Sequence, residues 1–204
     1  MSNIFYALPF AGAARAIRDG HPLPGTPYFY SLAAVNATVW CAYGLVAQDP
    51  FFIASDLFGS IASTFYYQAV LVSGRGRPGP ACIVFHTGLV AAVLLAAFYA
   101  QWGGPGAVGH TLGWAGNATS MAMLWAPIVD TIEAWQHRDP GRVLLPIAAM
   151  TAINSGIWTA YGIWLGLFYI WLPSLLTATS GVLQLCTWVA LRRGPGPSRG
   201  SCAI

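Results

Sequence analysis

Long stretches without charged side chains make up most of this sequence. Five of them contain no Asp, Glu, Lys or Arg, and a sixth, 50–73, contains Asp56 as its one charged residue. The five uncharged stretches are 28–48, 81–102, 107–129, 143–165 and 167–191. Each has the ~20 residues that an apolar helix needs to cross a bilayer. Charged residues make up 7% of the 204, against about a quarter in a soluble domain, so we expect an integral membrane protein.

The spanning stretches are expected to be helices, because lipid offers no hydrogen-bond partner to the backbone of an open strand. Residues 1–14 form a further uncharged segment, which is shorter than a full span. The chain is therefore predicted to be an all-α membrane protein with seven transmembrane helices, of which the first is shortened.

The basic residues predict the orientation of the chain in the membrane. All nine are arginines, and they follow the first, third, fifth and seventh segments. They are Arg15, Arg18, Arg75, Arg77, Arg138, Arg142, Arg192, Arg193 and Arg199. Basic residues accumulate in cytoplasmic loops, so we expect the N-terminus outside and the C-terminus in the cytoplasm. We expect the plasma membrane, and an internal membrane remains the alternative.

Two parts of the chain repeat each other at a fixed distance. The sequences 36–45 (NATVWCAYGL) and 154–163 (NSGIWTAYGI) share five identical residues in ten, at an offset of 118. Segments one to three and five to seven are therefore predicted to be copies, with segment four between them. Because the arginines of both copies lie on the same side, the repeat is parallel. Transporters built from repeats bind their substrate near the midplane of the membrane.

This repeat predicts the domain organisation. Residues 1–73 are expected to form a first bundle of three helices, 81–102 a linker helix and 107–191 a second bundle of three helices. Residues 192–204 are rich in Gly, Pro and Arg, and we expect them to form a disordered cytoplasmic tail.

Two tryptophans and two polar residues lie at the same predicted depth. Trp40 and Asp56 are eight and seven residues from the outer turn at 48–49, which places them roughly 11 Å below the surface at 1.5 Å per residue. Trp158 and Ser174 are each eight residues from the matching turn. Aromatic rings cover the C–H face of a sugar while polar groups bind its hydroxyls. The four residues are therefore predicted to bind a sugar; the alternative is that the indoles only pack between helices.

Asn36 and Asn154 lie one helical turn before the two tryptophans and on the same face. An amide side chain both donates and accepts hydrogen bonds, which suits recognition of sugar hydroxyls. Amides also form hydrogen bonds between membrane helices. The sequence does not decide between these two roles.

Four prolines form a second matched set in the inner half of the membrane: Pro9, Pro27, Pro127 and Pro146. A proline inside a helix removes a hydrogen bond and leaves a kink at which the helix can bend. We interpret this set as a hinge at a cytoplasmic gate.

These features resemble the SWEET sugar transporters of the PQ-loop group. The residues that carry the resemblance are Pro9, Pro27, Trp40 to Gly44 (WCAYG), Pro127, Pro146, Trp158 to Gly162 (WTAYG) and Leu183-Gln184-Leu185. The resemblance covers residues 1–191. It implies seven helices arranged as two parallel triple-helix bundles joined by a linker helix. It also implies bidirectional facilitated diffusion of mono- or disaccharides by alternating access, so no enzyme activity, cofactor or metal site is expected.

The resemblance further implies which residues line the sugar pocket. The family has tryptophans at two pocket positions, asparagines at two others, and further pocket residues one turn before the tryptophans and one turn before the prolines. These positions correspond to Trp40 and Trp158, to Asp56 and Ser174, to Asn36 and Asn154, and to Phe5 and Met123. This chain departs from the family at the two asparagines and in its shortened first helix.

Other functions are left open by these departures. Asp56 is an ionisable group at depth, which is costly and usually functional; it would suit an amine-bearing solute such as an amino acid, or coupling to protons. A non-transporting scaffold would fit a short first helix. The expected partners are a small sugar and membrane lipid, and a net charge of +3 argues against nucleic acid. Small side chains at Gly59, Ser60 and Ser63 permit close contacts, within one chain or in a homo-oligomer.

Overall fold

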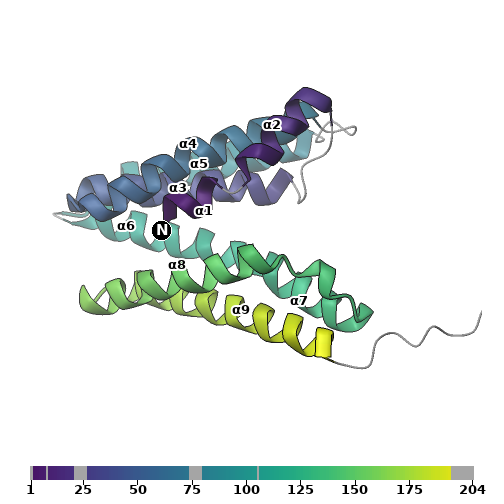
Figure 1. Ribbon diagram of the computed structural model, residues 1–204. Helices are drawn as coiled ribbons and strands as arrows, with labels where there is room; N and C mark the ends of the chain where they lie inside the picture. Colours follow the sequence, from purple (N-terminus) through teal and green to yellow (C-terminus); the bar gives the residue numbers. More distant parts are fainter. Residues whose placement is uncertain (1, 8, 21–26, 74–79, 105, 194–204) are drawn as a thin grey trace, which may run out of the picture. The chain divides into compact units, whose positions relative to one another are not determined.

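The computed structural model describes residues 2–7, 9–20, 27–73, 80–104 and 106–193, apart from the side chains of Ser2, Phe5 and Ser73. Over these residues the chain forms nine α-helices and one 3₁₀-helix, and no β-strand. The prediction of an all-α chain is confirmed. The helices form two compact units, Met1–Met123 and Leu124–Ile204 (Figure 1).

The helices follow the predicted segments closely. Unit 1 contains α1 (Ser2–Ala7), α2 (Phe10–Asp19), α3 (Pro27–Ala47), α4 (Pro50–Ser73), α5 (Pro80–Ala100) and α6 (Ala107–Met123). Unit 2 contains α7 (Trp125–His137), the 3₁₀-helix η1 (Pro140–Arg142), α8 (Leu145–Trp164) and α9 (Phe168–Arg193). Helices α1 and α2 occupy the first predicted segment, and α6 and α7 occupy the fifth. Helix α7 continues beyond the predicted end at 129, and residues 194–204 of the predicted tail lie outside the described residues.

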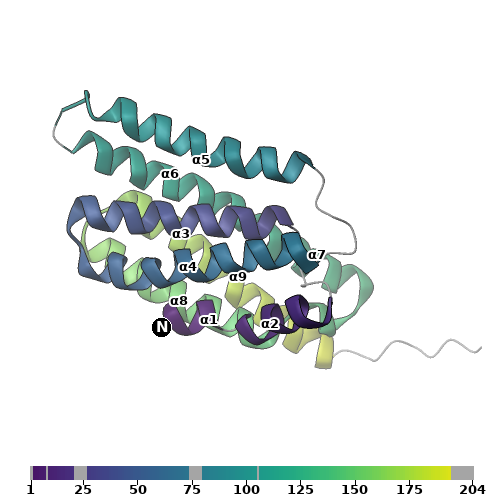
Figure 2. The same cartoon turned by 90° about the horizontal axis from the view of Figure 1, so that it is seen from above.

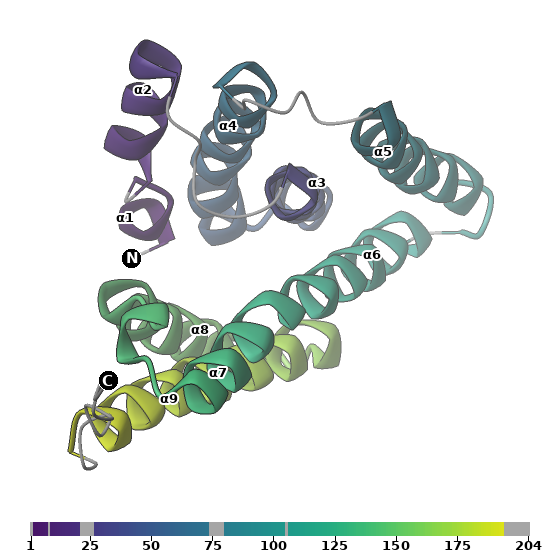
Figure 3. The same ribbon diagram turned by 90° about the vertical axis from the view of Figure 1, so that its right-hand side faces the viewer.

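Unit 1 is a layer of helices with α3 and α4 at its centre. Helices α1 and α2 pack against α4, while α5 and α6 pack against α3 (Figures 2 and 3). Its core combines tyrosines with small and aliphatic residues. The buried members are Ala13, Ala16, Tyr30, Ala62, Tyr66, Tyr67, Ala69, Val70 and Cys82.

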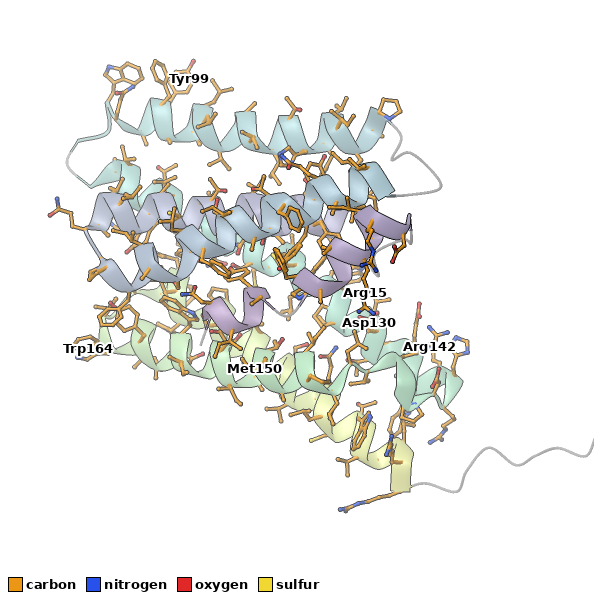
Figure 4. The ribbon with its side chains drawn as sticks, turned by 45° about the horizontal axis from the view of Figure 1, so that its top comes forward. Arg15, Tyr99, Asp130, Arg142, Met150 and Trp164 are labelled. Atoms are coloured by element: carbon orange, nitrogen blue, oxygen red, sulfur yellow. The ribbon has the colours of Figure 1, made fainter. Side chains whose placement is uncertain are left out.

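Unit 2 is built around the antiparallel pair α8 and α9, and α7 packs against α9. A small core of Ala134, Val143 and Ala148 closes the end that contains η1. There Arg142 forms an ion pair with Glu133. Arg142 lies just before the start of α8 and Trp164 is the last residue of this helix (Figure 4), so the arginine-rich connection and the second turn of this unit are separated by the length of a helix.

The glycine of each repeated motif makes the same close contact. A Cβ atom on Gly44 would lie 2.7 Å from Phe52 Cβ and 3.0 Å from Ile53 N. A Cβ atom on Gly162 would lie 2.7 Å from the backbone nitrogen of Trp171. The offset between Gly44 and Gly162, and between Ile53 and Trp171, is again 118. In each copy, glycine therefore lets the second helix approach the backbone of the third.

The turn after each of these glycines also has the same backbone structure. Asp49 N–H donates to Gly44 O (2.9 Å) and Leu167 N–H donates to Gly162 O (3.0 Å). The residue before each donor is left-handed, with φ of 52° at Gln48 and 69° at Gly166. This is the Schellman ending of a helix, in which the left-handed residue is usually glycine. Gln48 adopts this conformation with a side chain.

Replacing Gln48 by glycine is therefore expected to stabilise the protein. The gain should be about 0.5–1 kcal/mol, because the steric cost of a left-handed side chain exceeds the extra chain entropy of glycine. Thermal unfolding in detergent, followed by tryptophan fluorescence, measures the change. Gly166→Ala is the matched control and should shift the midpoint in the opposite direction. A Gln48→Gly variant that unfolds at a lower temperature than the wild type would contradict this account of the turn.

Among the residues that the structure describes, three helices are long and apolar enough to cross a membrane by their length and composition. They are Pro27–Ala47, Pro80–Ala100 and Phe168–Arg193, the helices α3, α5 and α9. In the fifth segment the chain divides instead into α6 and α7, of 17 and 13 residues. The chain is an integral membrane protein.

Candidate functional site

Trp40 is held firmly inside unit 1. Its side chain is 8% exposed, and its indole lies so close to α6 that a Cβ atom on Gly116 would come within 2.6 Å of the ring. The ring also stacks on Phe52 with centroids 5.6 Å apart and meets Tyr43 edge to face. The indole N–H donates to Ser120 Oγ at 3.3 Å. Packing between helices therefore accounts for much of the surface of this ring.

Asn36 joins α3 to α6 by hydrogen bonds. Its Nδ2 lies 2.7 Å from Thr119 Oγ1, 2.8 Å from Ser120 Oγ and 3.2 Å from Gly116 O. An amide nitrogen has two hydrogens to share among these three acceptors. The sequence left open whether Asn36 binds sugar hydroxyls or joins membrane helices. The structure shows hydrogen bonds of the second kind.

Asp56 is buried, at 8% exposed, and each of its carboxylate oxygens has a donor. Tyr6 Oη donates to Oδ1 at 3.4 Å, and Ser55 Oγ donates to Oδ2 at 2.9 Å. Tyr6 comes from α1 and its ring covers Gly59, where a Cβ atom would lie 2.4 Å from the ring. The carboxylate therefore takes part in attaching the short helix α1 to α4.

The matching residues of unit 2 lie in a less crowded setting. Trp158 is half-buried and meets Tyr161 edge to face, with centroids 5.7 Å apart. Asn154 on the same helix and Ser174 on α9 are also half-buried. Ser174 directly follows Pro173, a buried proline inside α9. Trp158 is thus less deeply buried than Trp40.

The two remaining predicted pocket residues lie next to the helix breaks. Met123 is the last residue of α6 and is half-buried. Phe5 belongs to α1, but its side chain lies outside the described residues. Each lies four residues before one of the matched prolines, Pro127 and Pro9.

The four matched prolines occupy two kinds of position. Pro9 separates α1 from α2, and Pro127 lies in the first turn of α7, where its missing N–H leaves the carbonyl of Met123 without its helical donor. Pro27 and Pro146 lie in the first turns of α3 and α8. A proline that begins a helix costs no hydrogen bond. Pro9 and Pro127 differ because each lies where one helix follows closely on another, and there a helical hydrogen bond is lost.

Ser120 and Tyr6 were not among the predicted site residues, but they form hydrogen bonds with them. Ser120 receives hydrogen bonds from both Asn36 and Trp40, and Tyr6 donates to Asp56. Small polar residues in a membrane helix are a general signal of a helix contact, and Thr119 and Ser120 carry that signal. Their partners are 80 or more residues away in the chain, so the sequence alone does not pair them.

A cavity of about 130 Å³ lies elsewhere in unit 1, between α3, α4 and α5. Its polar lining residues are Thr38, Thr64 and His86, and Trp40 and Asp56 are not among the residues that line it. His86 Nδ1 lies 2.9 Å from Ser31 Oγ, and its ring stacks on Tyr67. This histidine is therefore part of the packing of α5 against α3 and α4.

Known proteins are similar to this chain in sequence and in fold. Residues 110–195 match the model of a family described as "Sugar efflux transporter for intercellular exchange". The chain is 23% identical to bidirectional sugar transporter N3 of Medicago truncatula over 170 residues, which are 81% of this chain and 63% of that protein. It is 25% identical to sugar transporter SWEET1 of Rattus norvegicus over 154 residues, which are 74% and 68% of the two chains. The chain thus spans less than two thirds of the Medicago protein.

A solved structure has the same fold. The 3.7 Å structure of a eukaryotic SWEET transporter matches with a TM-score of 0.78 at 19% sequence identity, over 95% of this chain and 94% of that one. The relatives are named for transport and not for catalysis. Together with the doubled motif, these matches support the resemblance seen in the sequence: the chain is similar to SWEET sugar transporters in sequence and has their fold.

Proposed function

We propose that this protein carries mono- or disaccharides across a membrane in both directions, by facilitated diffusion and alternating access. The observation that carries the proposal is the recurrence of one tryptophan-bearing helix pair, α3 with α4 and α8 with α9, in a chain with the SWEET fold. The family description and the names of the relatives support a sugar as the substrate.

The proposal assigns roles to the matched residues. Stacking on the sugar ring falls to the tryptophans, and hydroxyl binding to the polar residues. The sugar-contacting residues are Trp40, Trp158, Asp56, Ser174, Asn36, Asn154, Phe5 and Met123. Pro9, Pro27, Pro127 and Pro146 would form the hinge of the cytoplasmic gate. The partial exposure of Trp158 supports its role most directly, because a residue that stacks on a sugar must be accessible to it.

The remaining features of the proposal concern the membrane. The arginine distribution supports an N-terminus outside the cell and a cytoplasmic C-terminus in the plasma membrane. We also propose the two triple-helix bundles, 1–73 and 107–191, with 81–102 as the linker between them. Assembly into a homo-oligomer within the lipid is part of the same proposal.

Uptake into proteoliposomes tests this function. Labelled glucose and sucrose are offered to vesicles that contain the purified protein, with and without a proton gradient and with empty vesicles as the control. A uniporter is expected to fill the vesicles to the outside concentration in both conditions, and to exchange label faster when the vesicles are preloaded with the same sugar. Accumulation above that concentration with the gradient would instead show proton coupling. If neither sugar enters faster than into empty vesicles, transport of these sugars is excluded.

A further inference from the structure

In both copies of the repeat, a side chain of the third segment (α4 or α9) donates to a backbone carbonyl beside a proline break. Tyr66 Oη on α4 donates to Tyr6 O at 2.6 Å. Gln184 Nε2 on α9 donates to Pro127 O at 3.2 Å. Residues 66 and 184 are 118 apart, the same offset that relates Pro9 to Pro127. Two different side chains thus occupy one position of the repeat and make the same kind of contact.

The carbonyls that receive these bonds lie within one turn of the breaks. Tyr6 is in the last turn of α1, three residues before Pro9, and Pro127 is in the first turn of α7. A proline disturbs the hydrogen bonds of its own helix, and in a membrane the affected backbone groups find donors on neighbouring helices. The carbonyls that Pro9 and Pro127 deprive of a helical donor belong to Phe5 and Met123, four residues before them. Tyr66 and Gln184 donate to Tyr6 O and Pro127 O, which lie beside the breaks. Thr131 Oγ1 also donates to Pro127 O, at 2.6 Å.

The surroundings of the two side chains suit a fixed contact. Tyr66 is 3% exposed and Gln184 is 8% exposed. In unit 1, α4 holds α1 at further points, because Tyr6 also covers Gly59 and donates to Asp56. In unit 2, Gln184 reaches from α9 to the start of α7. Each break is therefore tied to the third helix of its own copy.

We propose that Tyr66 and Gln184 are positioning residues that fasten the two proline breaks to the third helix of each copy. They determine how readily each broken helix bends, and so they act on sugar movement through the prolines and not by touching the sugar. The effect on transport rests on the proposed function, whereas the fastening itself does not.

Hydrogen–deuterium exchange of the purified protein in detergent tests the fastening. Tyr66→Phe removes one hydroxyl, and Gln184→Met removes the donor while keeping the length of the side chain; Gln184→Leu replaces it if the methionine variant does not fold. Tyr67→Phe is the matched control, because it removes a neighbouring buried hydroxyl whose contact is Cys82 Sγ at 4.0 Å. Peptides from α1 and α2 report on the first break, and peptides from α7 report on the second.

Each variant should loosen its own break and leave the other unchanged. Tyr66→Phe is expected to speed exchange in α1 and α2 about fivefold, the loss of one ordinary hydrogen bond, and Gln184→Met to do the same in α7. Tyr67→Phe should leave both at the wild-type rate. Unchanged exchange at both breaks, equal acceleration at both by a single variant, or equal acceleration by Tyr67→Phe would overturn the proposal.

Sugar exchange in proteoliposomes separates positioning from binding. Both variants are expected to lower the maximal rate about fivefold while the KM stays within about twofold of the wild type. A raised KM at an unchanged maximal rate would place these residues in the sugar site and overturn the positioning role. If the wild type carries neither sugar, the proposed function fails. The hydrogen–deuterium exchange measurements still decide whether the breaks are fastened.

Discussion

Trp158→Ala is expected to reduce sugar uptake to the level of empty vesicles, while the protein remains folded and in the membrane. Trp158 is half-buried, whereas Trp40 is buried, so its removal is expected to leave a smaller packing defect than the removal of Trp40. An indole that stacks on a pyranose provides much of the area that holds the sugar. Uptake of labelled sugar is compared with the wild type at equal amounts of protein, and the thermal midpoint is measured on the same sample.

Trp40→Ala is a useful comparison for Trp158→Ala, because the two tryptophans differ in how deeply they are buried. Trp40 lies on Gly116, stacks on Phe52 and donates to Ser120, so alanine would leave a large void between α3, α4 and α6. Its cost should be about 3–5 kcal/mol of folding free energy, seen as a lower yield of folded protein. Wild-type uptake by a folded Trp158→Ala protein would exclude this indole from the sugar site.

Gly162→Val is expected to lower the yield of folded protein strongly. The first atom added to Gly162 would lie 2.7 Å from the backbone nitrogen of Trp171 and 2.9 Å from Ile170 Cγ2. A backbone atom cannot rotate away as a flexible side chain can, so α8 and α9 would have to separate. Overpacking of this kind costs about 1–3 kcal/mol and sometimes more. The yield of monodisperse protein in detergent and its thermal midpoint measure the loss.

Gly156→Val is the matched control for this prediction. Gly156 lies on the same helix, and nothing lies within 4 Å of the place where its Cβ atom would be. Both variants carry the same β-branched side chain, so the difference between them isolates the contact with α9. Equal losses in the two variants would show that helix propensity, and not close packing, makes glycine necessary at 162.

The positions of the helices could be predicted because lipid leaves the backbone few choices. A run of ~20 apolar residues in a bilayer must satisfy its hydrogen bonds internally, and α3, α4 and α5 accordingly begin and end close to the predicted residues. The division of the fifth segment into α6 and α7 is more local. It depends on the single missing N–H of Pro127, whose effect on the path of a helix varies with the donors that neighbouring helices supply.

The contacts of the candidate site could be predicted only in part. The repeat drew attention to Trp40 and Asn36, but it could not show that both donate to Ser120 of a helix that begins 60 or more residues later. In the sequence, the glycine of each motif is only one of the residues that mark the repeat. The structure shows that Gly44 and Gly162 have a steric role. Such contacts follow from packing between distant segments, and periodicity along the chain does not encode them.

The Schellman endings of α3 and α8 suggest a way to detect distant relatives of this protein. Trp40, Gly44 and Gln48 are spaced by four residues, as are Trp158, Gly162 and Gly166. The last two positions of each trio are linked by backbone geometry, since a left-handed residue lies four positions after the carbonyl that closes the turn. A search pattern built on this spacing would therefore tolerate replacements at polar positions such as Asp56, which would defeat a pattern built on the proposed sugar-binding residues.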